Sequence, residues 1–325
     1  MQFRKVQQMG GASFLVSLPK DWARTAMLKK GSLVSIDTTA DGGVLIYPVN
    51  VTLKEGGDSE IEIDYPSKFG NEQIPKEITA AYLLGYNVIH LRGKRGIAPK
   101  DREKIVHSLK RLIGLEIVEE DNQSITAQFL VDDTAVEPNK IFKRISMLVK
   151  SMISDTFKQF LFGEKVQFES IAQRDDEVDR LHFLLVRLLR AAVRQPKIAN
   201  KFALTAIDCL DYRVAANSLE TAGDCAVELS AVLSSIDLVD EFIKEGFTRI
   251  GDALDSIQLG ATKSFVDKDF DRAQKVLEHC QTLEQLLGSF RENILRGEAS
   301  FVRTAEILER ILRCQRDIVD LVTPL

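Results

Sequence analysis

The decisive stretch of this sequence reads Asp211-Tyr-Arg-Val-Ala-Ala-Asn-Ser-Leu-Glu-Thr-Ala-Gly-Asp-Cys-Ala-Val-Glu-Leu229, and its apolar spacing predicts the middle of a long helix. Glu220 and Asp224 stand four residues apart within it, so their carboxylates share one helix face. Like charges at this spacing repel each other by roughly 0.2–0.5 kcal/mol unless a cation lies between them. The pair therefore predicts a cationic partner.

An earlier pair, Asp175 and Asp179, repeats this spacing. Two helices packed side by side would bring the four carboxylates together, and sets of oxygen ligands suit hard cations. We therefore predict a metal site made of Asp175, Asp179, Glu220 and Asp224. It would hold a divalent or trivalent ion such as Mg, Mn, Fe or Zn. The alternative is a solvated acidic helix face, the usual fate of such charge runs.

From Pro138 onward the apolar residues follow the helical period almost without interruption. A shift of 105 residues lays Ile145 onto Ile250, and a shift of 89 lays Leu219-Glu220 onto Leu308-Glu309. This internal repeat predicts an all-α domain over residues 137–325, built of two tandem three-helix bundles at 137–236 and 237–325. The predicted helices cover about 139–162, 166–195, 199–235, 238–265, 270–296 and 298–322.

The acidic pairs and the repeat resemble the PhoU family, phosphate-transport regulators built of two three-helix bundles with Glu/Asp-x-x-x-Asp patterns on their inner helices. The resemblance covers about residues 139–322. It implies that Asp175 with Asp179, and Glu220 with Asp224 in Leu-Glu-Thr-Ala-Gly-Asp, are the family's acidic pairs.

The second bundle departs from the family pattern. Its corresponding positions hold Cys280, Glu284, Glu309 and Arg313. Arg313 lies four residues after Glu309 and can itself neutralise that carboxylate. We therefore predict one competent carboxylate site and one vestigial site.

Residues 1–50 are predicted to form short strands around turns, and they carry a net charge of +3 against -8 for the remainder. A unit this short cannot bury enough apolar surface alone, so we expect it to dimerise or to pack against a neighbour. The predicted strands are 3–8, 13–18, 33–38 and 43–48, with one or two helical turns over 20–28.

Three motifs of this region resemble the SpoVT/AbrB swapped-hairpin DNA-binding domain. They are Val-Ser-Leu-Pro-Lys-x-Trp at 16–22, Leu-Lys-Lys-Gly-Ser-x-Val at 28–34 and Gly-x-Leu-Ile-x-Pro at 43–48. The resemblance implies a β barrel interleaved from two chains, with Arg4, Lys5, Lys20 and Arg24 contacting DNA phosphates. In the alternative reading these are solvated surface charges and the domain only dimerises.

Residues 51–136 are predicted to be a small α/β domain in the order βαβαββ, linking the other two domains. Its strands are expected at 60–64, 87–92, 115–119 and 124–131, and its helices at 76–85 and 99–113.

The composition is that of a globular protein, with 45% hydrophobic and 28% charged residues. Four cysteines without C-x-x-C spacing predict reduced, buried thiols, and no apolar run reaches membrane-spanning length. We therefore expect a cytoplasmic protein without membrane insertion.

These features predict a regulator of phosphate uptake that responds to phosphate supply, binds DNA as a homodimer and is not an enzyme. A second expected partner is the ATPase subunit of a phosphate ABC transporter. One alternative is an inhibitor that acts on this ATPase by protein contact alone, with the N-terminal module only dimerising. Another is a metal-dependent hydrolase, which is disfavoured because no His or Lys accompanies these acids in sequence.

Overall fold

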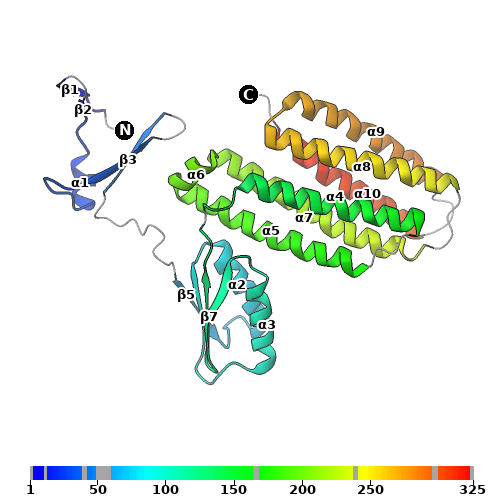
Figure 1. Cartoon of the computed structure of the whole chain (residues 1–325), viewed down its shortest axis with the longest axis horizontal. Helices are drawn as coiled ribbons and strands as arrows, with labels where there is room; N and C mark the ends of the chain where they lie inside the picture. Colours follow the sequence, from blue (N-terminus) through cyan, green and yellow to red (C-terminus); the bar gives the residue numbers. More distant parts are fainter. Residues whose placement is uncertain are drawn as a thin grey trace. The chain divides into compact units, whose positions relative to one another are not determined.

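The structure is a computed structural model of the 325-residue chain, and it describes residues 3–10, 13–38, 42–48, 60–132, 134–163, 168–236, 241–294 and 299–322. The chain divides into two compact units, Met1–Asp58 and Ser59–Leu325. The first unit contains the β-rich N-terminal elements, and the second contains the α/β part together with all the long helices (Figure 1). The α/β segment and the helices thus belong to one compact body.

The described residues of the first unit form two antiparallel strand pairs and one short helix. Strand β1 (Gln7–Met9) pairs with β2 (Ser13–Leu15), and β3 (Val34–Thr38) pairs with β4 (Val44–Pro48). Helix α1 (Lys20–Thr25) follows Pro19, whose fixed φ suits the entry to a helix. The tip of the predicted 33–48 hairpin, at residues 39–41, lies outside the described residues.

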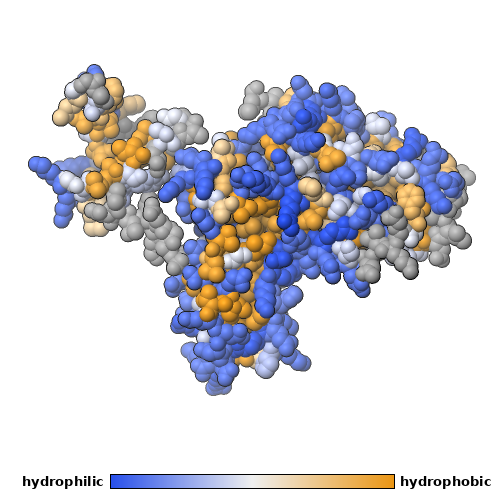
Figure 2. Space-filling model, viewed as in Figure 1, coloured by the Kyte–Doolittle hydropathy of each residue, from blue (hydrophilic) through white to orange (hydrophobic). Residues whose placement is uncertain are grey.

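Apolar side chains of the first unit are uncovered in the single chain, as the hydrophobic colouring in Figure 2 shows. Phe3 is 87% exposed, Met27 75% and Phe14 71%. Among the described residues of this unit, only Ala26 and Pro48 are buried. The predicted interleaved barrel needs strands from a second chain, so it stays a prediction.

The α/β part of the second unit has one four-stranded sheet in the order β5-β6-β8-β7. Strands β5 (Glu60–Tyr65) and β6 (Val88–Gly93) are parallel, while β8 (Ser124–Phe129) runs antiparallel to both β6 and β7 (Leu115–Glu120). Helices α2 (Ile74–Leu83) and α3 (Pro99–Lys110) bury Ile78 and Ile105 in the same core as Ile89 of β6. Apart from a 3-10 turn at Asn71–Gln73, the order of elements is the predicted βαβαββ.

The helical part contains two three-helix bundles. The first bundle consists of α4 (Pro138–Phe162), α5 (Phe168–Arg194) and α7 (Ala206–Leu233), and the second of α8 (Glu241–Asp267), α9 (Phe270–Ile294) and α10 (Ala299–Asp320). The bundles join where α7 packs on α10 and α4 packs on α8 (Figure 1). Polar bonds cross the second junction, including Lys150 Nζ to Asp255 Oδ2 at 2.6 Å. None of the helices in the described ranges is long and apolar enough to cross a membrane.

The predicted long helix over residues 199–235 is wrong at its start. A short helix, α6 (Pro196–Phe202), ends at Ala203 with a left-handed φ of 52°, and α7 begins afresh after Thr205. Thr205 and Asp208 form a capping box, in which each side chain accepts a hydrogen bond from the other residue's backbone N–H. Because this box satisfies the first free N–H groups of a helix, it fixes a new N-terminus there.

Three arginines of α5 hold the α/β part against the first bundle. Arg187 donates to the carbonyl oxygen of Tyr82 at 2.8 Å, Arg190 to that of Leu83 at 3.1 Å and Arg194 to that of Leu84 at 2.5 Å. These carbonyls end α2, where helical oxygens lack partners and the helix dipole is negative. The contact fixes α2 and, with it, α3 beside α5.

Candidate metal centre

Helices α5 and α7 position the four predicted carboxylates on facing sides of one helix pair. Asp175 and Asp179 lie on α5, and Glu220 and Asp224 on α7. Because the helices are antiparallel neighbours, the start of α5 faces the second half of α7. The structure therefore brings the four residues, here called the acidic cluster, into one region.

Gly223 makes the close approach possible. A Cβ atom at this position would lie 3.1 Å from Asp175 Oδ1, tighter than an ordinary contact. The absence of a side chain at 223 thus leaves room for the Asp175 carboxylate beside α7. Asp175 Oδ1 is buried and has no hydrogen-bond partner in the described part of the chain.

The cluster raises the pKa values of its own members. Burial and the charges of Asp224 and Asp179 raise the pKa of Asp175 from 3.8 to about 7. Burial, then Asp224 and Asp179, also raise the pKa of Glu220. Desolvation raises the pKa of Asp224, although Arg310 opposes this. Asp175 is therefore the member whose negative charge is least compensated.

Arg111 supplies a positive charge that sequence reasoning missed. It follows α3 in the α/β part, and its Nη2 lies 2.8 Å from Asp179 Oδ2 and 3.2 Å from Asp176 Oδ1. Burial raises the pKa of Asp179, and the Arg111 guanidinium opposes that rise. Arg111 stands far from the acids in sequence, so no local spacing could reveal the contact.

His182 was also missed, although it lies three residues after Asp179 and hence near the same helix face. It is 6% exposed, and its Nε2 lies 3.3 Å from Arg213 Nη1. Burial, with Arg213 nearby, lowers the pKa of His182 to about 4, so the ring is neutral at pH 7. His182 is thus close to the acids in sequence, and its neighbour in the structure is Arg213.

The fit of a metal ion to this cluster is partial. Within the described residues, no three His, Cys, Asp or Glu side chains lie in an arrangement that could hold a metal ion. The donor chemistry nevertheless suits a hard cation, because carboxylate oxygens predominate and the buried Asp175 Oδ1 lacks a partner. The Arg111 guanidinium compensates the negative charge of Asp179. The buried Asp175 Oδ1 has no such partner in the described part of the chain.

In the second bundle, each of the two corresponding carboxylates has an arginine of its own as a partner. Glu284 pairs with Arg316 at 2.9 Å, and Glu309 pairs with Arg291 at 3.6 Å, so Arg291 takes the role predicted for Arg313. Cys280 is fully buried, and burial raises the pKa of its thiol to about 11. All four cysteines are free and buried, as predicted.

The predicted DNA contacts are exposed on the first unit. Arg4 and Lys5 precede β1, so they lie before the first strand and not in it. Lys20 and Arg24 stand four residues apart on α1 and share one face. Arg24 Nη2 lies 4.0 Å from Asp21 Oδ1, and both side chains are exposed.

These features define a multidomain protein whose two-bundle helical body carries an acidic cluster between two helices of its first bundle. Comparison with known families names the parts. The model described as "PhoU domain" matches residues 142–232, and the model described as "Antidote-toxin recognition MazE, bacterial antitoxin" matches residues 7–63. The chain thus contains a segment that matches the PhoU domain and an N-terminal segment that matches a MazE/AbrB-like domain, and these matches confirm the two resemblances.

The limits of the two matches are informative. The PhoU match runs from α4 to the end of α7, so it contains the acidic cluster and leaves the second bundle outside. The MazE match extends beyond residue 50 into β5. Neither match names a catalytic domain.

Among solved structures, the chain is similar to PhoU from Pseudomonas aeruginosa, with 14% sequence identity and a TM-score of 0.39. The similarity covers 57% of this chain and 93% of that chain. No curated protein sequence matches.

Proposed function

We propose that this protein is a cytoplasmic regulator of phosphate uptake that binds DNA as a dimer and has a cation-binding helical body. The observation that carries the proposal is the acidic cluster around Asp175, which lies inside the segment matched by the PhoU model. The MazE-type match at residues 7–63 supports a DNA-binding role for the first unit. Its exposed apolar side chains support dimerisation, because a second chain would bury them.

In this proposal Asp175, Asp179, Glu220 and Asp224 attract the cation, and their side chains must turn toward it, because no three of them are placed as ligands in the described residues. A bound divalent ion would supply the positive charge that offsets the repulsion among these carboxylates. Asp179 is shared, because it also accepts a hydrogen bond from Arg111 of the α/β part. The charge of the cluster therefore bears on the contact between the α/β part and α5.

The DNA-binding role is tested by sequencing the DNA that co-purifies with the full chain from phosphate-rich and phosphate-poor cultures. We expect sites upstream of phosphate-uptake genes to be enriched in one of the two conditions. Deletion of residues 1–49 should abolish the enrichment and leave the helical body soluble. DNA retention by the truncated chain would show that the contact lies elsewhere.

A second candidate function is inhibition of the phosphate transporter ATPase by direct contact, with the first unit acting only as a dimer clamp. It is favoured by the apolar exposure of the first unit, which dimerisation alone would explain. The salt dependence of DNA retention separates the two functions. Each phosphate contact makes the fall of the logarithm of the binding constant with the logarithm of the salt concentration steeper by about 0.9. A clamp without DNA contacts would show no such slope.

A further inference from the structure

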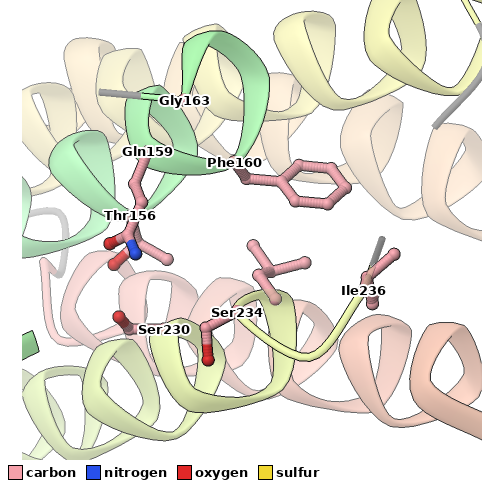
Figure 3. A pocket seen from close by; sticks show the side chains of 8 residues that line it. Thr156, Gln159, Phe160, Gly163, Ser230, Ser234 and Ile236 are labelled. Atoms are coloured by element: carbon pink, nitrogen blue, oxygen red, sulfur yellow. The ribbon is translucent and has the colours of Figure 1, made fainter. Parts of the chain in front are cut away.

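A cavity of about 300 Å³ lies between the last turns of α4 and α7 (Figure 3). Thr156, Gln159 and Phe160 line it from α4, Ser230 and Leu233 from α7, and Ser234 from the C-cap of α7. Its volume is at the lower end of the range found for small-molecule sites. Ser230 lies six residues beyond Asp224 on α7, so the cavity is separate from the acidic cluster.

Two polar atoms at this cavity lack partners. Ser230 is 2% exposed, and its Oγ makes no hydrogen bond in the described part of the chain. Gln159 Oε1 is likewise buried and without a partner there. Figure 3 shows the two side chains on facing helices across the gap. Because unpaired buried polar groups are costly, both atoms call for a hydrogen-bonding occupant.

The lining determines the charge of that occupant. None of the lining side chains that the structure describes is ionisable, and the neighbouring Asp155 is paired with Arg174, with Arg174 Nη1 2.8 Å from Asp155 Oδ2. An ionic ligand would therefore lose its hydration without gaining a counter-charge from the described lining. Phe160, Leu233 and Ile236 supply apolar surface beside the polar atoms. The cavity thus suits a body that is apolar on one side and polar on the other.

We propose that this cavity binds a small uncharged molecule with a ring-sized apolar body and an amide or hydroxyl edge. Gln159 Oε1 accepts a hydrogen bond from that edge, and Ser230 Oγ bonds the same edge as donor or acceptor. Phe160 and Leu233 pack against the apolar body. This inference is independent of the proposed cation and DNA sites.

Three molecules of one shape and different chemistry test the proposal on the full chain. Benzamide has the neutral polar edge, benzoate replaces it with a charge, and toluene removes it. Isothermal titration calorimetry should show benzamide binding in the millimolar range, with benzoate and toluene at least about tenfold weaker. Benzoate binding as tightly as benzamide would overturn the proposal, and so would absence of benzamide binding.

Variants assign the binding to this cavity. Gln159→Leu and Ser230→Ala should each weaken benzamide by up to about tenfold. Ser235→Ala is the control, because Ser235 is exposed just beyond the end of α7 and does not line the cavity. Circular dichroism shows whether each variant is folded, and unchanged benzamide affinity in both folded cavity variants would overturn the assignment.

The free protein gives a second readout. Removal of an unsatisfied polar atom should leave the melting temperature equal or higher in Ser230→Ala and Gln159→Leu. A lower melting temperature in both, without benzamide binding, would indicate that an ordered water satisfies the two atoms, and this too would overturn the proposal.

Discussion

Replacement of Asp175 by Asn tests the electrostatics of the acidic cluster most directly. Asn keeps the size of the side chain in the space beside Gly223 and removes the negative charge. Burial and the facing carboxylates raise the pKa of Asp175 from 3.8 to about 7. Between these two values the folded protein holds a proton that the unfolded chain has released.

The sign and size of the effect follow from this difference. A raised folded-state pKa means that the stability contribution is fully present below pH 4 and is lost as the pH rises through 7. In that window the free energy of unfolding of wild type falls by about 1.4 kcal/mol for each unit of pH, whereas the Asn side chain does not titrate and contributes no such loss. The stability of Asp175→Asn relative to wild type should therefore grow by at most roughly 3 kcal/mol from pH 5 to pH 8.

Urea unfolding followed by far-UV circular dichroism measures this difference, with EDTA present to remove metal ions. Fluorescence is unsuitable, because the single tryptophan is Trp22 of the first unit. Asp176→Asn is the matched control: its side chain is 69% exposed and pairs with Arg111, so its loss should cost about 0–1 kcal/mol.

Two results would refute this reasoning. One is an Asp175→Asn variant that is destabilised equally at pH 5 and pH 8, because the wild-type carboxylate would then be satisfied. The other is an equal pH response in Asp176→Asn, which would make the effect a general one of net charge.

Three further predictions concern other parts of the chain. EDTA should lower the melting temperature of wild type but not that of Glu220→Ala/Asp224→Ala. Glu309→Ala should keep the response to EDTA. Its free energy of unfolding should fall by only about 0–1 kcal/mol, because the lost ion pair with Arg291 is exposed. Arg4→Ala/Lys5→Ala should weaken DNA binding across sequences and reduce the salt slope by about one unit per lost contact, and an unchanged slope would make these residues spectators. Arg187→Met should lower the free energy of unfolding by about 3 kcal/mol in urea titrations. The side chain is only 1% exposed, and its Cζ lies 3.7 Å from the centroid of the Phe129 ring, so its loss removes buried hydrogen bonds and a ring contact together. Arg190→Met, at an exposed position, should cost less than about 1 kcal/mol, and equal losses would contradict the burial argument.

The helical period predicted most of the fold because each helix of the two bundles buries one continuous apolar stripe. The same signal ran through the break between α6 and α7, since Ile198, Cys209 and Tyr212 are all buried. The sequence nevertheless indicates the break, because Thr205-x-x-Asp208 has the spacing of a capping box. A local signal was present there, and the longer period outweighed it.

The candidate site was predictable only where its residues share a helix. Spacing placed Asp175 with Asp179 and Glu220 with Asp224, and it could have added His182 on the same side of α5. Arg111 could not be found this way, because its position depends on how the α/β part packs against α5. The room for Asp175 depends likewise on Gly223 of the facing helix, which is a tertiary contact.

The contacts between the α/β part and α5 differ in what controls them. At the end of α5, Arg187 bonds backbone carbonyls of the α/β part, and these oxygens carry no titratable charge. Nearer its start, Arg111 bonds Asp176 and Asp179, whose attraction depends on the charge of the acidic cluster. A cavity of about 430 Å³, lined by Lys76, Arg111 and Asp179, lies between α2, α3 and α5 and leaves room for adjustment. Under the proposed function, a cation at the cluster would compete with Arg111 for Asp179 and weaken only the second contact, while the Arg187 contact serves as a fixed pivot. On that proposal the α/β part would respond to the charge of the cluster in addition to connecting the two ends of the chain.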